Sequence, residues 1–147
     1  MATEILKYGY KAHREIVAGN NRVSYGKFAG KYCEAIAHLF LAEQYQGLGK
    51  TKKSTEHFRK CGLILEDCLK AEQVFDVKLA ALEKCRIFRA FQLMFEYQSR
   101  ISTNSSQLLE KSKDYERQFD QAKDSLVKEG MLEKVLQDRN WVYTPLN

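Results

Sequence analysis

Residues Thr51 to Ser99 read TKKSTEHFRKCGLILEDCLKAEQVFDVKLAALEKCRIFRAFQLMFEYQS, and this stretch decides the fold class. It contains one glycine, Gly62, and no proline, so it has few signals that would stop a helix. Because the stretch is far longer than an ordinary globular helix, we expect two antiparallel helices joined by a tight turn near residues 73–76.

The second of these helices is apolar over most of its circumference. Its apolar side chains are Leu79, Leu82, Ile87, Phe88, Phe91, Met94 and Phe95. Its polar residues are confined to a narrow stripe through Glu83, Arg86, Arg89 and Glu96. A helix of this kind is buried by neighbours on several sides, so we predict that it is the central helix of the fold.

Helical patterns continue on both sides of this stretch. Residues 3–18 and residues 24–46 carry apolar side chains three and four positions apart, and Gly47-Leu48-Gly49 is a helix stop. After a serine-rich turn at 102–106, an apolar seam predicts a helix that reaches about residue 129. The seam runs through Leu108, Ser112, Tyr115, Phe119, Ala122 and Leu126. A short helix at 131–138 follows.

Together these patterns predict an all-α protein of five or six helices in antiparallel hairpins. A chain of 147 residues that is 44% hydrophobic is typical of one globular domain. We expect residues 1–139 to form the hairpins and 140–147 to form an extended tail packed on them. No apolar run approaches the roughly 18 residues of a membrane helix, so we expect no transmembrane segment.

The positive charge of the chain is concentrated in its first half. Residues 1–70 carry 12 basic and 7 acidic side chains, whereas residues 71–147 carry 12 of each. We call the densest basic stretch the basic segment; it consists of Lys50, Lys52, Lys53, Arg59 and Lys60. It predicts contact with an anionic surface of an acidic protein, a lipid or an RNA, and a solvated turn is the alternative.

The cysteines form no recognisable metal or redox motif. They are Cys33, Cys61, Cys68 and Cys85, without a Cys-x-x-Cys pair or a paired Cys–His zinc pattern. We therefore expect small core thiols and no metal. Free thiols are typical of a reducing intracellular compartment. The cytoplasm is the expected one, and an organellar or cytoskeletal assembly is the alternative.

No catalytic motif is present either. The run Gly47-Leu48-Gly49-Lys50-Thr51 resembles the end of a phosphate-binding loop, but position 44 is glutamine and a helix precedes it, so we interpret it as a helix stop followed by an N-cap threonine. The histidines, His13, His38 and His57, fall on three predicted helices without a nucleophile or carboxylate at a catalytic spacing. We expect His38 to be a hydrogen-bonded core or boundary residue, and we expect neither enzymatic activity nor a cofactor.

Two motifs are similar to a known helical family. Residues 31–39 read KYCEAIAHL and are similar to a recurring motif of the family, with Cys33 where the family has glycine. The matching positions are Lys31, Tyr32, Glu34, Ile36, Ala37 and Leu39. Residues 138–145 read DRNWVYTP and match its closing motif through Trp141 and Tyr143, although an arginine is inserted and the proline comes early. The chain thus resembles the last third of a BRO1 domain, the module of ALIX-type endosomal-sorting adaptors.

The resemblance implies a hairpin scaffold related to tetratricopeptide arrays and without enzymatic activity. The family's surface for membrane-remodelling subunits lies largely in parts that this chain lacks. A tetratricopeptide pattern also suits residues 35–55, but no second copy follows at a period of about 34 residues. We expect a non-enzymatic scaffold or adaptor, a small structural subunit that binds partner proteins in a larger assembly. The alternatives are an endosomal-sorting adaptor at a membrane surface and an RNA-contacting subunit of a ribonucleoprotein.

Overall fold

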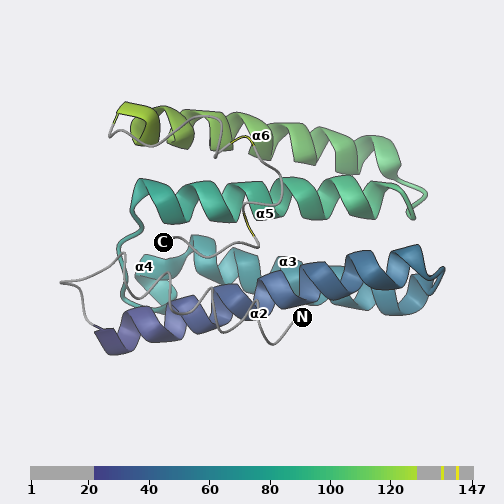
Figure 1. Cartoon of the computed structure of the whole chain (residues 1–147), viewed down its shortest axis with the longest axis horizontal. Coiled ribbons are helices and arrows are strands. Elements are labelled where there is room, and N and C mark those ends of the chain that lie inside the picture. Colours follow the sequence, from purple (N-terminus) through teal and green to yellow (C-terminus); the bar gives the residue numbers. More distant parts are fainter. Residues whose placement is uncertain (1–21, 129–136, 138–141, 143–147) are drawn as a thin grey trace. The chain divides into compact units, whose positions relative to one another are not determined.

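The computed structural model describes residues 22–128, 137 and 142, and every regular element in these residues is a helix (Figure 1). The all-α prediction is therefore confirmed. The chain divides into two compact units. Unit 1 is described from Arg22 to Leu79, and unit 2 from Ala80 to Lys128 together with Gln137 and Val142.

Unit 1 is a helical hairpin followed by a short helix. Helix α2 spans Arg22–Gly47, α3 spans Thr51–Leu69 and α4 spans Ala71–Val74. Helices α2 and α3 run antiparallel, side by side (Figure 1). Apolar residues three and four apart place one stripe of each helix in the core between them. The largest of these buried side chains are Phe28, Tyr32, Ile36, Leu39, Phe58 and Leu65.

The turn between α2 and α3 confirms the predicted helix stop. Gly49 has a φ of 74°, in the left-handed region that glycine adopts without strain, and the Lys50 amide donates to the Tyr45 carbonyl at 2.9 Å. The expected N-cap threonine is wrong, because Lys50 is the N-cap and Thr51 is already helical. No side chain caps the first turn of α3, so this helix begins without the usual polar cap.

The segment after α3 is longer than the tight turn that we predicted. Helix α4 occupies part of it, and residues 75–80 then lead to the next helix. Asp76, two residues beyond the end of α4, has a φ of 53°, and the Val77 amide donates to the Ala71 carbonyl at 3.2 Å. The Phe75 ring meets Phe28 edge-on, with centroids 5.9 Å apart. Packing of Phe75 and Val77 against unit 1 therefore replaces the tight turn with an anchored connection.

Unit 2 is a second helical hairpin. Helix α5 spans Ala81–Ser99 and α6 spans Ser105–Lys128, and the two lie antiparallel (Figure 1). The seam predicted for α6 is confirmed, because its members are buried or half-buried. In both hairpins a buried serine of the second helix bonds a backbone carbonyl of the first: Ser54 Oγ donates to Ala42 at 2.8 Å, and Ser112 Oγ donates to Gln92 at 3.0 Å. These small side chains allow the paired helices to approach closely.

Helix α5 is buried around most of its circumference, as predicted. Glu83, Arg86 and Arg89 of its polar stripe are buried too, whereas Glu96, Phe88 and Phe95 are only half-buried. Arg89 illustrates how a charge is accommodated. Its guanidinium lies 3.8 Å from the centre of the Phe119 ring and donates to the Gln92 side chain at 2.6 Å. The ring and the amide replace part of the water that the charge loses.

Several expectations concern residues outside the described part of the chain. These are the helix at 3–18, the helix at 131–138 apart from Gln137, and the tail with Trp141 and Tyr143. Within the tail only Val142 is described, and it is buried. Among the described helices, none combines the length and the apolarity that crossing a membrane requires.

Candidate functional site

The basic segment lies at the α2–α3 turn and along the first turns of α3. Lys50 is the N-cap residue, and the other four members belong to α3. All five side chains are exposed to solvent. The structure therefore brings the predicted residues together at one end of the unit 1 hairpin.

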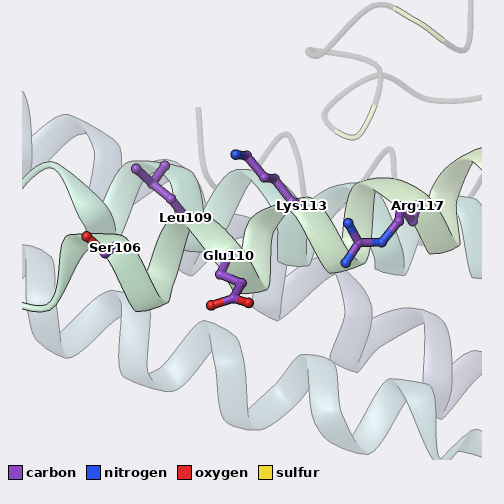
Figure 2. A pocket seen from close by; sticks show the side chains of 5 residues that line it. All are labelled: Ser106, Leu109, Glu110, Lys113 and Arg117. Carbon is purple, nitrogen blue, oxygen red and sulfur yellow. The ribbon is translucent and has the colours of Figure 1, made fainter.

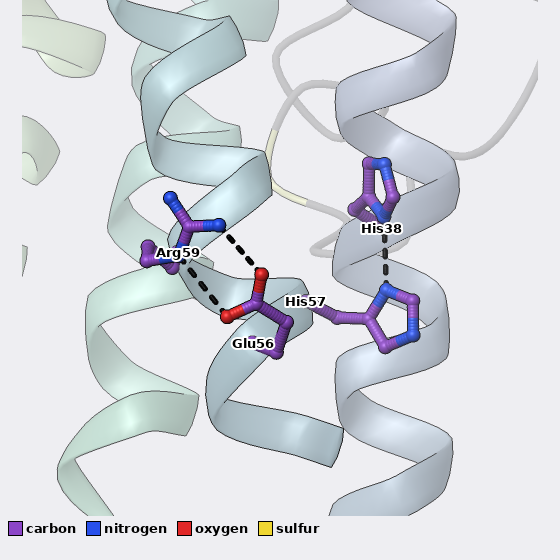
Figure 3. A network of polar contacts seen from close by, with 4 residues as sticks. All are labelled: His38, Glu56, His57 and Arg59. Carbon is purple, nitrogen blue, oxygen red and sulfur yellow. Dashed lines mark hydrogen bonds and ion pairs between the residues drawn. The ribbon is translucent and has the colours of Figure 1, made fainter. Parts of the chain in front are cut away.

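Arg59 differs from the lysines because it has an acidic partner. Its Nε and Nη2 atoms donate to the Glu56 carboxylate at 3.1 and 2.5 Å, on the side of α3 turned away from α2 (Figure 3). These hydrogen bonds lower the pKa of Glu56. None of the four lysines forms an ion pair with a described residue. The uncompensated charge of the basic segment therefore resides on its lysines.

The charges of α3 oppose the dipole of the helix. Lys52 and Lys53 lie in its first turn, which contains no acidic residue, while Glu66 and Asp67 lie near its other end, where the last turn contains no basic residue. The amino-terminal end of a helix carries partial positive charge, so each lysine there is unfavourable by roughly 0.3–1 kcal/mol when exposed. Lysines that weaken their own helix indicate a role other than helix stability.

Two histidines from neighbouring helices meet beside the basic segment. The Nδ1 atoms of His38 on α2 and His57 on α3 are 2.9 Å apart, and the rings point toward each other (Figure 3). Tyr45 stacks on His57 with centroids 5.4 Å apart and an interplanar angle of 12°. Lys53 Nζ lies 5.4 Å from the centre of the Tyr45 ring. We call these four residues the histidine cluster.

The short contact between the two rings requires a single shared proton. One Nδ1 must carry hydrogen and donate, while the other accepts through its lone pair. Burial, followed by the charge of His57, lowers the pKa of His38. Burial, followed by the charge of Lys60, lowers the pKa of His57. Both rings are therefore neutral at neutral pH, a state in which one Nδ1 can donate and the other can accept.

Sequence reasoning found only part of this cluster. The expectation that His38 is a hydrogen-bonded boundary residue is confirmed, since it is half-buried and bonded. Its pairing with His57 was missed, because the two residues were assigned to separate helices and judged separately. Their roughly equal distance from the turn at Gly47 to Lys50 is the signal that could have revealed it. In an antiparallel hairpin, such positions lie opposite each other.

We predict that the histidine pair makes the stability of the chain depend on pH. Because both pKa values lie below the ordinary 6.5, the unfolded chain binds more protons than the folded chain in acid. The stabilisation is fully present above about pH 6.5 and is lost as the pH falls through the lowered values. The free energy of unfolding changes with pH by less than about 1.4 kcal/mol per pH unit for each proton, since both rings are partly solvated.

Urea unfolding measured at several pH values between about 7.5 and 5 tests this prediction. The double variant His38→Asn/His57→Asn should show a shallower dependence than the parent chain. Asparagine keeps a hydrogen-bonding side chain at each position but does not titrate in this range. Parallel curves for the two proteins would contradict the assignment of this pH dependence to the pair.

The cysteines are core residues. All four are free and buried, as expected from their positions on apolar helix faces. Burial raises the pKa of Cys85 to about 12 and also raises the pKa of Cys61 and Cys68. These thiols therefore stay protonated and unreactive at neutral pH. The described residues contain no group of three or more side chains suited to holding a metal ion.

The family-like residues on α2 have packing positions. The buried members are Tyr32, Ile36, Ala37 and Leu39. Lys31 and Glu34 form an exposed ion pair at 3.4 Å, one turn apart on the same helix. These contacts account for the KYCEAIAHL pattern through the core and surface of the hairpin.

Unit 2 presents a shallow hollow of about 460 Å³ along α6. Its described lining consists of Ser106, Leu109, Glu110, Lys113 and Arg117. Figure 2 shows Glu110 pointing away from Leu109 and Lys113, so the polar groups do not converge. Binding sites for small molecules use convergent groups in a concave pocket, and this lining comes from one helix. The hollow therefore supplies no candidate catalytic or ligand site.

Comparisons with known proteins add no family. No protein-family model, curated protein or solved structure matches the chain. The similarity to BRO1 domains thus rests on the motifs at 31–39 and 138–145 alone, and it stays a prediction.

Proposed function

We propose that this chain is a non-enzymatic helical scaffold, a structural subunit that binds an acidic partner protein in a larger assembly. The observation that carries the proposal is the placement of Lys52 and Lys53 in the uncapped first turn of α3, at the positive end of the helix. An acidic partner would offset both the lysine charges and the helix dipole there. The free energy that the lysines cost the isolated helix would then be recovered when the partner binds.

The shape of the surface favours a protein partner over a membrane. Leu48 in the turn and Leu63 on α3 are both exposed, Leu63 by 53%. From Thr51 to Leu63 the helix rises about 18 Å, so charge and apolar surface extend along its side. A flat bilayer touching the tip at Leu48 would leave most of that side uncovered. A partner helix with acidic and apolar residues would cover it.

The chemistry of the surface also disfavours RNA. Single-stranded nucleic acid binds through aromatic rings on which bases stack, alternating with basic side chains. The aromatic ring next to the lysines is Tyr45, which is half-buried and already contacts His57 and Lys53. Among the described residues of this surface, no exposed aromatic ring remains for a base.

We predict that reversing three lysines weakens partner binding without unfolding the chain. The variant Lys52→Glu/Lys53→Glu/Lys60→Glu should recover at least tenfold less partner, a loss of about 1.4 kcal/mol or more. Tagged chains purified from their native source at two salt concentrations, followed by quantitative mass spectrometry, provide the measurement. Circular dichroism and melting temperature show that the variant is folded.

A matched control carries the same change in net charge on unit 2. Lys84, Lys113 and Lys128 are exposed, and their reversal to glutamate should leave partner recovery within about twofold of the parent. Equal losses in both variants would mean that only net charge matters and would contradict the proposed surface. Sedimentation with anionic vesicles that is lost only in the first variant would identify a lipid surface as the partner. An RNA gel shift that is lost only in the first variant would identify an RNA.

A further inference from the structure

We propose that docking of an acidic partner segment on the basic segment takes up one proton at the His38–His57 pair, so the interaction strengthens as the pH falls from about 7.5 to 5.5. This inference rests on the proposed function and adds its regulation. The partner segment is glutamate- or aspartate-rich and helical, since charge and exposed leucines are spread along α3.

The geometry places the histidine pair within reach of the partner. Lys53, His57 and Lys60 follow one another at spacings of four and three on α3, so they share one flank of the helix. His57 therefore lies between two lysines that have no ion pair among the described residues. His38 reaches the same point from α2 (Figure 3). A carboxylate that approaches both lysines also approaches the imidazole pair.

The charges around the pair leave it in a positive surrounding. From α2 it faces Glu34 and Tyr45, and from α3 it faces Lys53, Glu56 and Lys60. Glu34 is paired with Lys31 at 3.4 Å, and Glu56 is held by the Arg59 guanidinium. The nearby acids are thus largely compensated, whereas the two lysines are not. Proton binding to the pair is opposed until an external anion arrives.

The hydrogen bond between the rings determines how many protons can be added. In the neutral pair, the donor ring carries its hydrogen on Nδ1 and has a free lone pair on Nε2. A first added proton binds that Nε2 and keeps the Nδ1–H···Nδ1 bond, which becomes charge-assisted. A second proton would have to bind the accepting Nδ1 and would break the bond. Docking is therefore coupled to the uptake of one proton.

Linkage converts this uptake into pH-dependent affinity. An acidic segment near Lys53, Lys60 and the rings raises the pKa of the pair above its value in the free chain. Between these two values, affinity rises by up to tenfold for each unit that the pH falls, the limit for one proton. Over the two pH units considered, the expected decrease in dissociation constant is about fivefold to twentyfold.

A synthetic helical peptide of glutamate and leucine, labelled with a fluorophore, serves as the acidic probe. Glutamate titrates near pH 4.3, so the charge of the peptide is nearly constant above about pH 5.5. Fluorescence anisotropy with the full chain at constant ionic strength gives the dissociation constant at each pH. Nuclear magnetic resonance of the histidine ring protons gives the pKa values with and without peptide.

The expected result is tighter binding at low pH and a raised histidine pKa in the complex. The double variant His38→Asn/His57→Asn should bind with less than a twofold change across the same range. The matched control is His13→Asn, which removes the remaining histidine and should keep the pH dependence. If the double variant is unfolded by circular dichroism, His38→Gln/His57→Gln, which also leaves no titrating group at either position, takes its place.

Three outcomes would overturn the inference. Binding that weakens with Lys52→Glu/Lys53→Glu/Lys60→Glu but does not vary with pH leaves the docking surface standing and removes the proton linkage. A pH dependence that persists in the histidine variant assigns the linkage to another group. Absence of probe binding at every pH overturns the linkage together with the proposed acidic-segment docking.

Discussion

Phe91→Ala is expected to lower the free energy of unfolding by about 3–5 kcal/mol, the usual cost of deleting a large buried aromatic side chain. Phe91 is only 1% exposed on α5. Its ring stacks on Tyr115 of α6 with centroids 4.4 Å apart and also contacts Phe95 at 6.2 Å. The alanine removes this stacking and leaves a cavity in the seam of unit 2.

Urea unfolding followed by circular dichroism measures this loss. Leu109→Ala on α6 is the control, because Leu109 is 42% exposed and its truncation should change stability by less than about 0.5 kcal/mol. If Phe91→Ala fails to fold, Phe91→Leu keeps most of the volume and should lose less. A Phe91→Ala chain as stable as the control would contradict the packing of α5 against α6.

Phe28→Ala is expected to cost a similar 3–5 kcal/mol in unit 1. Phe28 is fully buried on α2, and its ring meets Phe75 edge-on at an interplanar angle of 72°. This contact fixes the segment after α4 as well as the core of the hairpin. Hydrogen exchange of the Val77 amide, which donates to Ala71, should therefore accelerate in the variant.

Val74→Ala provides the comparison for Phe28→Ala. Val74 is 48% exposed on α4, close to the same segment in sequence. Its truncation should leave both the unfolding free energy and the exchange of the Val77 amide near the parent values. Equal exchange rates in the two variants would show that Phe28 does not anchor the connection.

Local pattern predicted the four longer helices of the described residues, but it did not predict the short helix α4. The glycine pair around Leu48 ends α2 at Gly47 because a left-handed residue cannot continue a helix, and this signal is carried by a few adjacent residues. The seam of α6 was read correctly for the same reason, since three-and-four spacing is a property of one segment. The connection at residues 70–80 was harder to predict, because its course depends on where Phe75 and Val77 pack.

Burial of charge could not be read from the pattern of α5. The stripe of Glu83, Arg86 and Arg89 is polar in sequence yet buried in the structure. Whether such side chains are buried depends on partners that lie elsewhere in the chain, as Phe119 does for Arg89. The hydrophobicity of one helix does not contain that information.

By itself, the sequence determined that the chain is helical, where most described helices begin and end, and that a basic segment follows the α2–α3 turn. These features depend on neighbours within a few residues, so composition and spacing are sufficient to predict them. Only the tertiary structure decided that His38 and His57 share a proton beside the uncompensated lysines. That contact joins residues 19 positions apart. It forms because the packing of two antiparallel helices fixes which residues of one helix lie opposite which residues of the other.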